Sequence, residues 1–201
     1  MERFTLPGIP GELNWRIPPR DWSAGPGNRL KIVAAERTDW FVDPATRALQ
    51  DNAPVALFTP PVAEFLLIAR VNVAFASTFD AGSIQLRASD DLWAKLCFEY
   101  SPAGEPMIVS VVTRGLSDDC NSAVIAGDEV RLRVAVTPAT IAFHYSTDGR
   151  RWSLVRYFSL GSVDGLRVGF SAQSPTGDGC AAEFGDITWQ PRRLSDIRNG
   201  E

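Results

Sequence analysis

The chain has 201 residues, of which 45% are hydrophobic, and this length and composition are typical of one globular domain. Twenty Lys and Arg residues against twenty-four Asp and Glu residues give a formal net charge of −4. Such a balance lacks the basic field that nucleic acid requires and the charge excess of a disordered chain. We therefore expect a folded protein with no nucleic-acid partner.

The cysteines and the apolar runs bear on the cellular compartment. Cys97, Cys120 and Cys180 are odd in number and share no close spacing, which favours free thiols over a disulfide framework or a zinc site. Cys180, in a Gly-Cys-Ala turn, is expected to be the most exposed and reactive of the three. No secretory apolar segment opens the sequence, and Phe65–Ala69 is far shorter than the ~20 residues of a membrane span. These features predict a cytoplasmic protein with no membrane partner.

Nine segments are rich in Val, Ile, Phe and Tyr, and each ends at a cluster of Gly, Pro, Asp or Ser residues. They are Phe65–Phe75, Ser83–Ala88, Trp93–Tyr100, Met107–Thr113, Glu129–Thr137, Thr140–Ser146, Leu154–Phe158, Leu166–Ala172 and Ala182–Trp189. Strands at this spacing, without alternating helices, predict an all-β sandwich of two antiparallel sheets.

The remaining segments differ in composition. Residues 1–28 are rich in Pro and Gly, which predicts a lead-in of edge strand and loop. The sandwich is expected over residues 29–190, followed by a polar C-terminal tail at 191–201. One short helix is predicted at Pro44–Gln50, because Asp43 suits the N-cap and Pro suits the first helical position.

Two hairpins can be placed in register from the sequence. Asp148-Gly149 fits a two-residue type I′ turn that would set Tyr145 opposite Trp152 on an apolar face. His144 would then lie opposite Ser153 on the other face, where a lone histidine is more often solvated than catalytic. For the hairpin Ser83–Tyr100 we expect a three-residue loop.

The register of that second hairpin follows from two constraints. An odd loop length is needed to place the apolar residues of both strands on one face. A three-residue loop sets Arg87 opposite Trp93 and Gln85 opposite Lys95, whereas a five-residue loop would place the like charges of Arg87 and Lys95 together. The same alternation predicts which side chains are buried between the sheets: Ile84, Leu86, Leu96, Phe98, Phe143, Tyr145, Val168 and Phe170.

The opposite face of this hairpin carries a row of polar side chains with one aromatic ring. It can be an ordinary solvated sheet face, with Arg87 stacked on Trp93, or a binding face for a polar ring such as a sugar. In the binding interpretation the candidate ligand-binding residues are Gln85, Arg87, Trp93, Lys95 and Glu99.

Motifs for catalysis and metal binding are absent from the sequence. It has no Gly-rich phosphate loop, no Gly-x-Ser-x-Gly and no His-Glu-x-x-His. Glu99 lacks a second carboxylate at a fixed offset, as glycoside hydrolysis would require. The pairs Asp90-Asp91 and Asp118-Asp119 can bind calcium, but turn preference accounts for them without a metal. We expect no catalytic residue, no metal and no cofactor.

Several segments in order resemble those of a family described as regulation-of-enolase-like, domain of unknown function 1349. They are Thr38–Phe41, Phe79–Gly82, Trp93–Tyr100, Ser110–Gly115, Ser117-Asp118, Ser146–Trp152 and Gln173–Gly177. The resemblance implies a concanavalin A-like jelly-roll sandwich of two curved antiparallel sheets, and no catalysis. This chain departs from the family pattern in two places: Asp80-Ala81 lacks an intervening Gln, and Asp119 stands where an aromatic residue is frequent.

The sequence is compatible with three functions from different classes. The first is a non-catalytic module that binds a carbohydrate or polyol on the polar face, which requires that face to be hollowed. The second is a protein-interaction or regulatory module with an exposed apolar patch for its partner. The third is a glycosidase-like enzyme, which requires Glu99 or Asp118 to have a perturbed pKa in a cleft with a second acid nearby.

Overall fold

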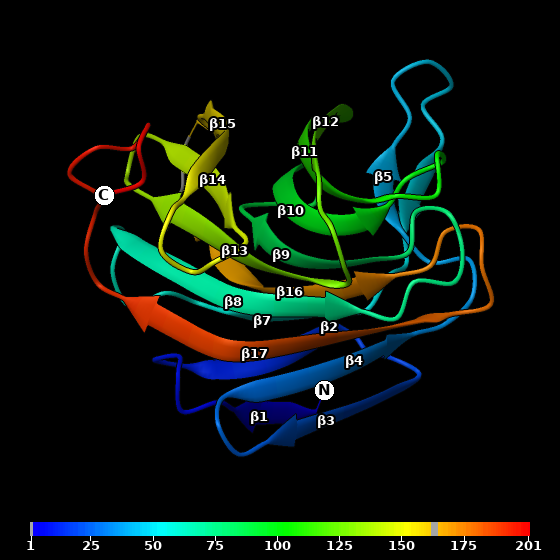
Figure 1. The fold of residues 1–201 in the computed structure, drawn as a ribbon, viewed down its shortest axis with the longest axis horizontal. Coiled ribbons are helices and arrows are strands. Elements are labelled where there is room, and N and C mark those ends of the chain that lie inside the picture. Colours follow the sequence, from blue (N-terminus) through cyan, green and yellow to red (C-terminus); the bar gives the residue numbers. More distant parts are fainter. Residues whose placement is uncertain (1, 162–164) are drawn as a thin grey trace.

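The computed structural model describes residues 2–161 and 165–201, which form an all-β sandwich of two large antiparallel sheets with curved strands (Figure 1). The first sheet has eight strands, in the spatial order β1 (Arg3–Thr5), β2 (Glu12–Ile17), β7 (Val55–Phe58), β16 (Arg167–Gln173), β9 (Ala81–Arg87), β10 (Leu92–Tyr100), β11 (Pro106–Arg114) and β12 (Leu116–Val124). The second sheet has seven strands, in the order β15 (Ser153–Phe158), β14 (Ile141–Ser146), β13 (Glu129–Val136), β8 (Phe65–Val73), β17 (Cys180–Gln190), β4 (Arg29–Ala34) and β3 (Asp21–Gly25). A separate hairpin joins β5 (Trp40–Val42) to β6 (Leu49–Asp51). The predicted fold class is confirmed.

The core lies between the two sheets. Leu96 and Phe98 of β10 are fully buried there, as is Phe143 from the facing sheet. Seven of the eight side chains predicted for this layer are buried, whereas Tyr145 is only half-buried at its margin. Alternation along the strands therefore identified the inner face correctly.

The register predicted for the hairpin of β9 and β10 is confirmed. Trp93 lies opposite Arg87, and Lys95 lies opposite Gln85. The avoidance of a like-charge pair and the requirement for one apolar face were sufficient to fix this register.

The register predicted for the hairpin of β14 and β15 is wrong. Tyr145 lies opposite Ser153 rather than Trp152, and His144 lies opposite Leu154, with a shift in register between Phe143 and His144. The turn is longer than two residues because the Asp148 carboxylate accepts hydrogen bonds from the backbone amides of Arg150 and Arg151, both at 2.8 Å. An Asp side chain that organises the loop in this way replaces the backbone pairing of a type I′ turn.

His144 is fully buried rather than solvated. The C-terminal residues pack over this part of the seven-stranded sheet, and the Nε2 atom of His144 lies 2.8 Å from the carbonyl oxygen of Ile197. Burial lowers the pKa of His144 to about 4, so the ring is neutral at physiological pH.

The helix predicted at Pro44–Gln50 is absent. Residues 44–48 lie in the connection between β5 and β6, and Leu49 and Gln50 begin β6. Asp43 does accept hydrogen bonds from the amides of Ala45 and Thr46, as an N-cap would. The chain then turns back at Arg47, which has a φ of 62° and so cannot continue a right-handed helix. Figure 1 shows the hairpin beside the first sheet, near β10 and β12.

All three cysteines are free, as predicted, but their expected order of exposure is wrong. Cys180 is buried because it begins β17 and pairs with Ala34 of β4, and burial raises its pKa to about 12. Cys120, on the edge strand β12, is the exposed thiol. Across residues 2–161 and 165–201, no helix has the length and apolarity needed to cross a membrane.

Candidate functional site

The polar row predicted on β9 and β10 lies on the face of the eight-stranded sheet that points away from the other sheet. It is not solvated: the exposed fraction is 0% for Gln85 and Arg87, 1% for Trp93, 2% for Lys95 and 8% for Glu99. The interpretation as an ordinary solvated face is therefore wrong. The β5–β6 hairpin and its flanking residues cover this face, which sequence alternation alone could not reveal.

An aromatic side chain of the hairpin covers one end of the row. The Trp40 ring lies 6.3 Å from the Trp93 ring, and the guanidinium of Arg87 lies 4.2 Å from the centre of the Trp40 ring. The indole of Trp40 donates a 2.9 Å hydrogen bond to the carbonyl of Ala53, which fixes its orientation. The Arg87–Trp93 pair predicted as a ligand platform is thus occupied by Trp40, a residue of the protein itself.

Burial leaves two polar groups under the hairpin without hydrogen bonds. Neither side-chain atom of Gln85 has a hydrogen-bond partner within the described part of the chain, and the same holds for all three guanidinium nitrogens of Arg87. Burial and the nearby charge of Arg16 lower the pKa of Arg87 to about 10, although it stays charged at neutral pH.

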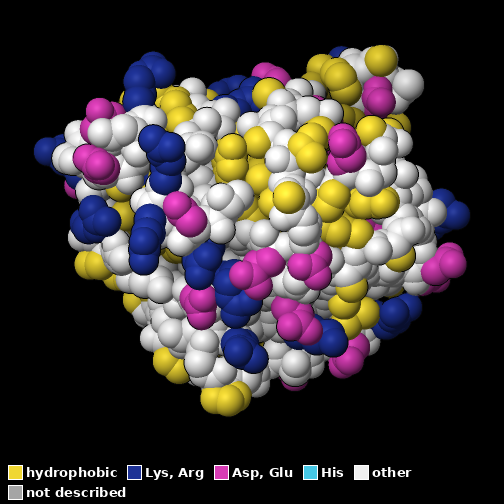
Figure 2. All heavy atoms as spheres, in the orientation of Figure 1, with side chains coloured by type: hydrophobic (Ala, Val, Ile, Leu, Met, Phe, Trp, Pro, Cys, Tyr) yellow, Lys and Arg dark blue, Asp and Glu magenta, His cyan; other side chains and the backbone are white. Residues whose placement is uncertain are grey.

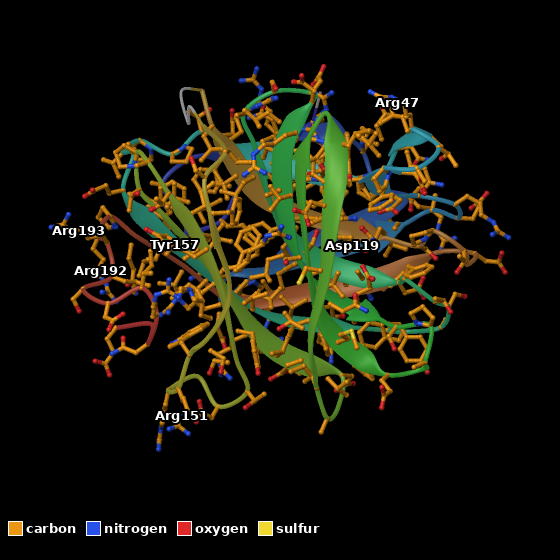
Figure 3. The ribbon with its side chains drawn as sticks, turned by 90° about the horizontal axis from the view of Figure 1, so that it is seen from above. Arg47, Asp119, Arg151, Tyr157, Arg192 and Arg193 are labelled. Atoms are coloured by element: carbon orange, nitrogen blue, oxygen red, sulfur yellow. The ribbon has the colours of Figure 1, made fainter. Side chains whose placement is uncertain are left out.

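The other end of the row opens into a cavity of about 160 Å³. Its walls come from the hairpin, from the loop before β9, and from β10, β11, β12 and β16: Asp39, Phe41, Phe79, Lys95, Glu99, Val111, Asp119 and Gln173. Two of the five predicted ligand-binding residues, Lys95 and Glu99, line the cavity, whereas Gln85, Arg87 and Trp93 do not. Figure 3 labels Asp119 on β12, on the same side of the molecule as Arg47 of the hairpin turn.

Lys95 is held in this cavity by two partners. Its Nζ atom donates a 2.8 Å hydrogen bond to the Asp39 carboxylate and a 2.7 Å hydrogen bond to the side-chain carbonyl of Gln173. Burial opposes the charge on Lys95, but the carboxylate of Asp39, with Cys97 and Glu99, outweighs burial and raises its pKa. Lys95 is therefore a fixed cation, neutralised by Asp39.

Glu99 has no such partner. Its Oε2 atom accepts a 3.4 Å hydrogen bond from the Gln173 amide, and within the described residues no cation lies within ion-pair distance. Burial raises the pKa of Glu99 to about 8, with Lys95 opposing the rise and Asp39 and Asp119 adding to it. The carboxyl group is consequently protonated at neutral pH and can donate a hydrogen bond into the cavity.

The remaining wall combines an acid with two aromatic rings. Desolvation also raises the pKa of Asp119, which lies on the exposed strand β12 opposite Val111. Phe79 is 37% exposed at the cavity and has a φ of 71°, a conformation that a bulky side chain rarely adopts. Its amide donates to the carbonyl of Tyr100 at 2.7 Å, and its own carbonyl accepts from Gln173 at 3.2 Å. These bonds hold the main chain of Phe79 in this strained conformation.

Sequence reasoning missed Asp39, Asp119 and Gln173 as parts of the site. Asp39 and Gln173 lie within the segments on which the family resemblance rests, as do five other lining residues. The remaining residue, Asp119, is one of the two departures from the family pattern. The family segments therefore meet at one cavity in the folded protein. The sequence contains these segments, but it does not show that they lie together. Within residues 2–161 and 165–201, no group of three or more His, Cys, Asp or Glu side chains is arranged to hold a metal ion.

The fold defines an all-β protein, a sandwich of two antiparallel sheets, with a small polar cavity on the outer face of one sheet. Residues 15–192 match the family described as protein of unknown function (DUF1349), and the chain belongs to that family. It is 32% identical over 160 residues to Regulation of enolase protein 1 of Saccharomyces cerevisiae, a match that covers 79% of each chain.

Solved structures show the same fold. A functionally unknown protein from Saccharomyces cerevisiae matches with a TM-score of 0.81 and 25% identity, over 90% of this chain and 97% of the other. A GH43 protein from Bacillus licheniformis matches with a TM-score of 0.70 and 18% identity, over 90% of this chain but only 36% of that protein. The second likeness concerns the fold alone.

Proposed function

We propose that this protein binds a small polyhydroxylated ligand, a monosaccharide or polyol, in the cavity between β10 and the β5–β6 hairpin. The observation that supports this most directly is the side-chain composition of the cavity: a fixed cation, a protonated carboxyl group and an amide lie beside two aromatic rings. Hydroxyl groups need directional donors and acceptors, and the C–H face of a sugar ring packs against an aromatic ring.

The size of the cavity limits the ligand. About 160 Å³ lies below the ~300–1,000 Å³ of pockets that enclose drug-sized molecules, so the cavity fits one sugar unit or a short polyol. Phe79 supplies the exposed ring, in place of the buried Trp93. The strained backbone of Phe79 supports a functional role, because such conformations cluster at ligand sites.

Calorimetric titration with glucose, galactose, xylose and sorbitol at millimolar concentrations tests this proposal. Single-site binding is expected at about 0.1–1 mM. Phe79→Ala and Glu99→Gln should each weaken it about tenfold, because each removes a group that contacts the ligand. Tyr157→Ala is the matched control, since Tyr157 is an exposed ring on β15 that does not line the cavity. No binding by any of the four ligands, or equal losses in all three variants, would refute the proposal.

A glycosidase-like activity is the second candidate, because Glu99 meets the criterion set for it: a raised pKa in a cavity with a second acid. Glu99 would protonate the leaving group, and Asp119 would be the opposing carboxylate, since Asp39 is bonded to Lys95. Hydrolysis of aryl glycosides that is abolished in Glu99→Gln would favour this activity over simple binding. Binding without turnover would instead suit a regulatory role of the kind that the yeast relative's name describes.

A further inference from the structure

The charges in the cavity do not balance. Three acidic side chains, Asp39, Glu99 and Asp119, face one basic side chain, Lys95. Lys95 lies 2.8 Å from Asp39, and this pair is internally neutral. Glu99 and Asp119 are then left without an ion-pair partner among the described residues.

Glu99 is the more deeply buried of the two acids. It is only 8% exposed, and the side-chain hydrogen bond that its Oε2 atom accepts from the Gln173 amide is long, at 3.4 Å. Ionising a carboxyl group this deeply buried is costly unless donors or a cation stabilise the charge. Asp119 lines the same cavity, so two acids without an ion-pair partner among the described residues surround one small space.

The two aromatic rings complete the environment of a cation. Phe41 and Phe79 line the cavity together with both acids, and a ring face attracts a positive charge. The three acids are not grouped to hold a metal ion in the described part of the chain, and Asp39 is already bonded to Lys95. An organic ammonium group needs only two carboxyl groups and an apolar wall.

We propose that the ligand of this cavity carries a protonated amine, which binds between Glu99 and Asp119 and against Phe41 and Phe79. This inference rests on the proposed function and specifies the ligand as an amino sugar or amino polyol. Glu99 faces Lys95, Asp39 and Asp119, and its raised pKa means that it is protonated in the free protein. An ammonium group beside it favours the ionised form, so binding should release a proton from Glu99.

A matched pair of ligands tests the inference on the full chain. Sorbitol and 1-amino-1-deoxysorbitol differ only in one amine, which is protonated at neutral pH. Calorimetry should show that the amine binds at least about tenfold more tightly, and that the preference falls as salt is added. Measurements in two buffers of different ionisation enthalpy should show release of close to one proton per amine bound at pH 7, and none for sorbitol.

Three variants test which acidic residues cause the preference for the amine and the proton release. Asp119→Asn should weaken binding of the amine much more than binding of sorbitol, and so remove most of the preference for the amine. Glu99→Gln should abolish the proton release. Asp118→Asn is the control, because Asp118 is the adjacent acid but pairs with Arg156 at 2.8 Å. It should leave the preference intact.

The outcomes separate the two proposals. Equal affinity for sorbitol and its amine would overturn the inference and leave the proposed function standing. A preference for the amine that survives in Asp119→Asn and is lost in Asp118→Asn would place the amine elsewhere and also overturn the inference. If neither molecule binds at millimolar concentration, the inference and the proposed function both fail.

Discussion

The ammonium of Lys95 and the carboxylate of Asp39 lie 2.8 Å apart, although 56 residues separate them in the sequence. Their side chains are only 3% and 14% exposed. This pair ties the residue before β5 to the middle of β10, and so holds the hairpin over the polar face of the eight-stranded sheet. The pair also defines one wall of the cavity.

Asp39→Asn should therefore lower the free energy of unfolding by about 3–5 kcal/mol, because it leaves the buried charge of Lys95 without its counter-ion. Urea denaturation of the variant measures the loss. Asp51→Asn is the control, since Asp51 is an exposed acid on the same hairpin and should change stability little. Equal stability of the two variants would show that the pair does not hold the hairpin.

Gln85→Met should leave stability unchanged or raise it by about 1 kcal/mol. Both polar atoms of Gln85 are buried without a partner, and an apolar side chain of similar size removes that desolvation cost. Gln173→Met is the matched contrast, because Gln173 bonds to Lys95 and to the carbonyl of Phe79 and should lose about 1–3 kcal/mol. A large loss in Gln85→Met would mean that the amide is satisfied in solution.

Stability should fall as pH rises from about 4.5 to about 8 through the titration of Glu99. The unfolded carboxyl ionises near 4.5, whereas the folded group keeps its proton up to about 8. The folded state therefore binds more protons in this window, and each pKa unit of difference corresponds to about 1.4 kcal/mol.

The comparison of wild type with Glu99→Gln isolates this contribution. The variant should gain stability relative to the wild type with increasing pH across the window, and the difference should be constant above it. Chemical denaturation at pH 5, 6.5 and 8 measures the trend. A stability difference that is independent of pH would contradict the burial of Glu99.

Thiol accessibility gives a separate check of the fold. In the native protein one thiol, Cys120, should react rapidly with a thiol reagent, and three should react after denaturation. Cys97 and Cys180 are protected because burial excludes the reagent and raises the pKa of both thiols. Modification of Cys120 alone can be verified by mass spectrometry of peptides. Fast labelling of Cys180 would show that the pairing of β17 with β4 opens easily.

Much of the sandwich was predictable because strands alternate and sheets must bury one face. The hairpin of β9 and β10 was placed residue for residue by that rule. The β14–β15 hairpin was not, because the Asp148 side chain organises its loop and a register shift follows Phe143. The edge strand β12, a largely exposed run of Ser, Asp, Cys and Asn residues, gave no apolar signal to detect.

The candidate site was predictable only in part. Alternation grouped Lys95 with Glu99 correctly, but it could not show that a second hairpin covers the face. Trp40-Phe41-Val42 is a strand-forming run directly before the supposed helix, and pairing it with Leu49–Asp51 would have predicted the cover. Asp39 and Gln173 come from distant parts of the chain, so only the folded arrangement joins them to Lys95.

The central claim, that the cavity beside Lys95 and Glu99 is the ligand site, is tested most directly by protein-observed NMR. A mixture of glucose, galactose, xylose and sorbitol is added at about 1–10 mM, above the expected dissociation constant. We predict that amide shifts concentrate at Asp39, Phe79, Glu99, Asp119 and Gln173. Shifts confined to other surfaces, such as the turn at Ser146–Arg151, or no shifts at all would contradict the account.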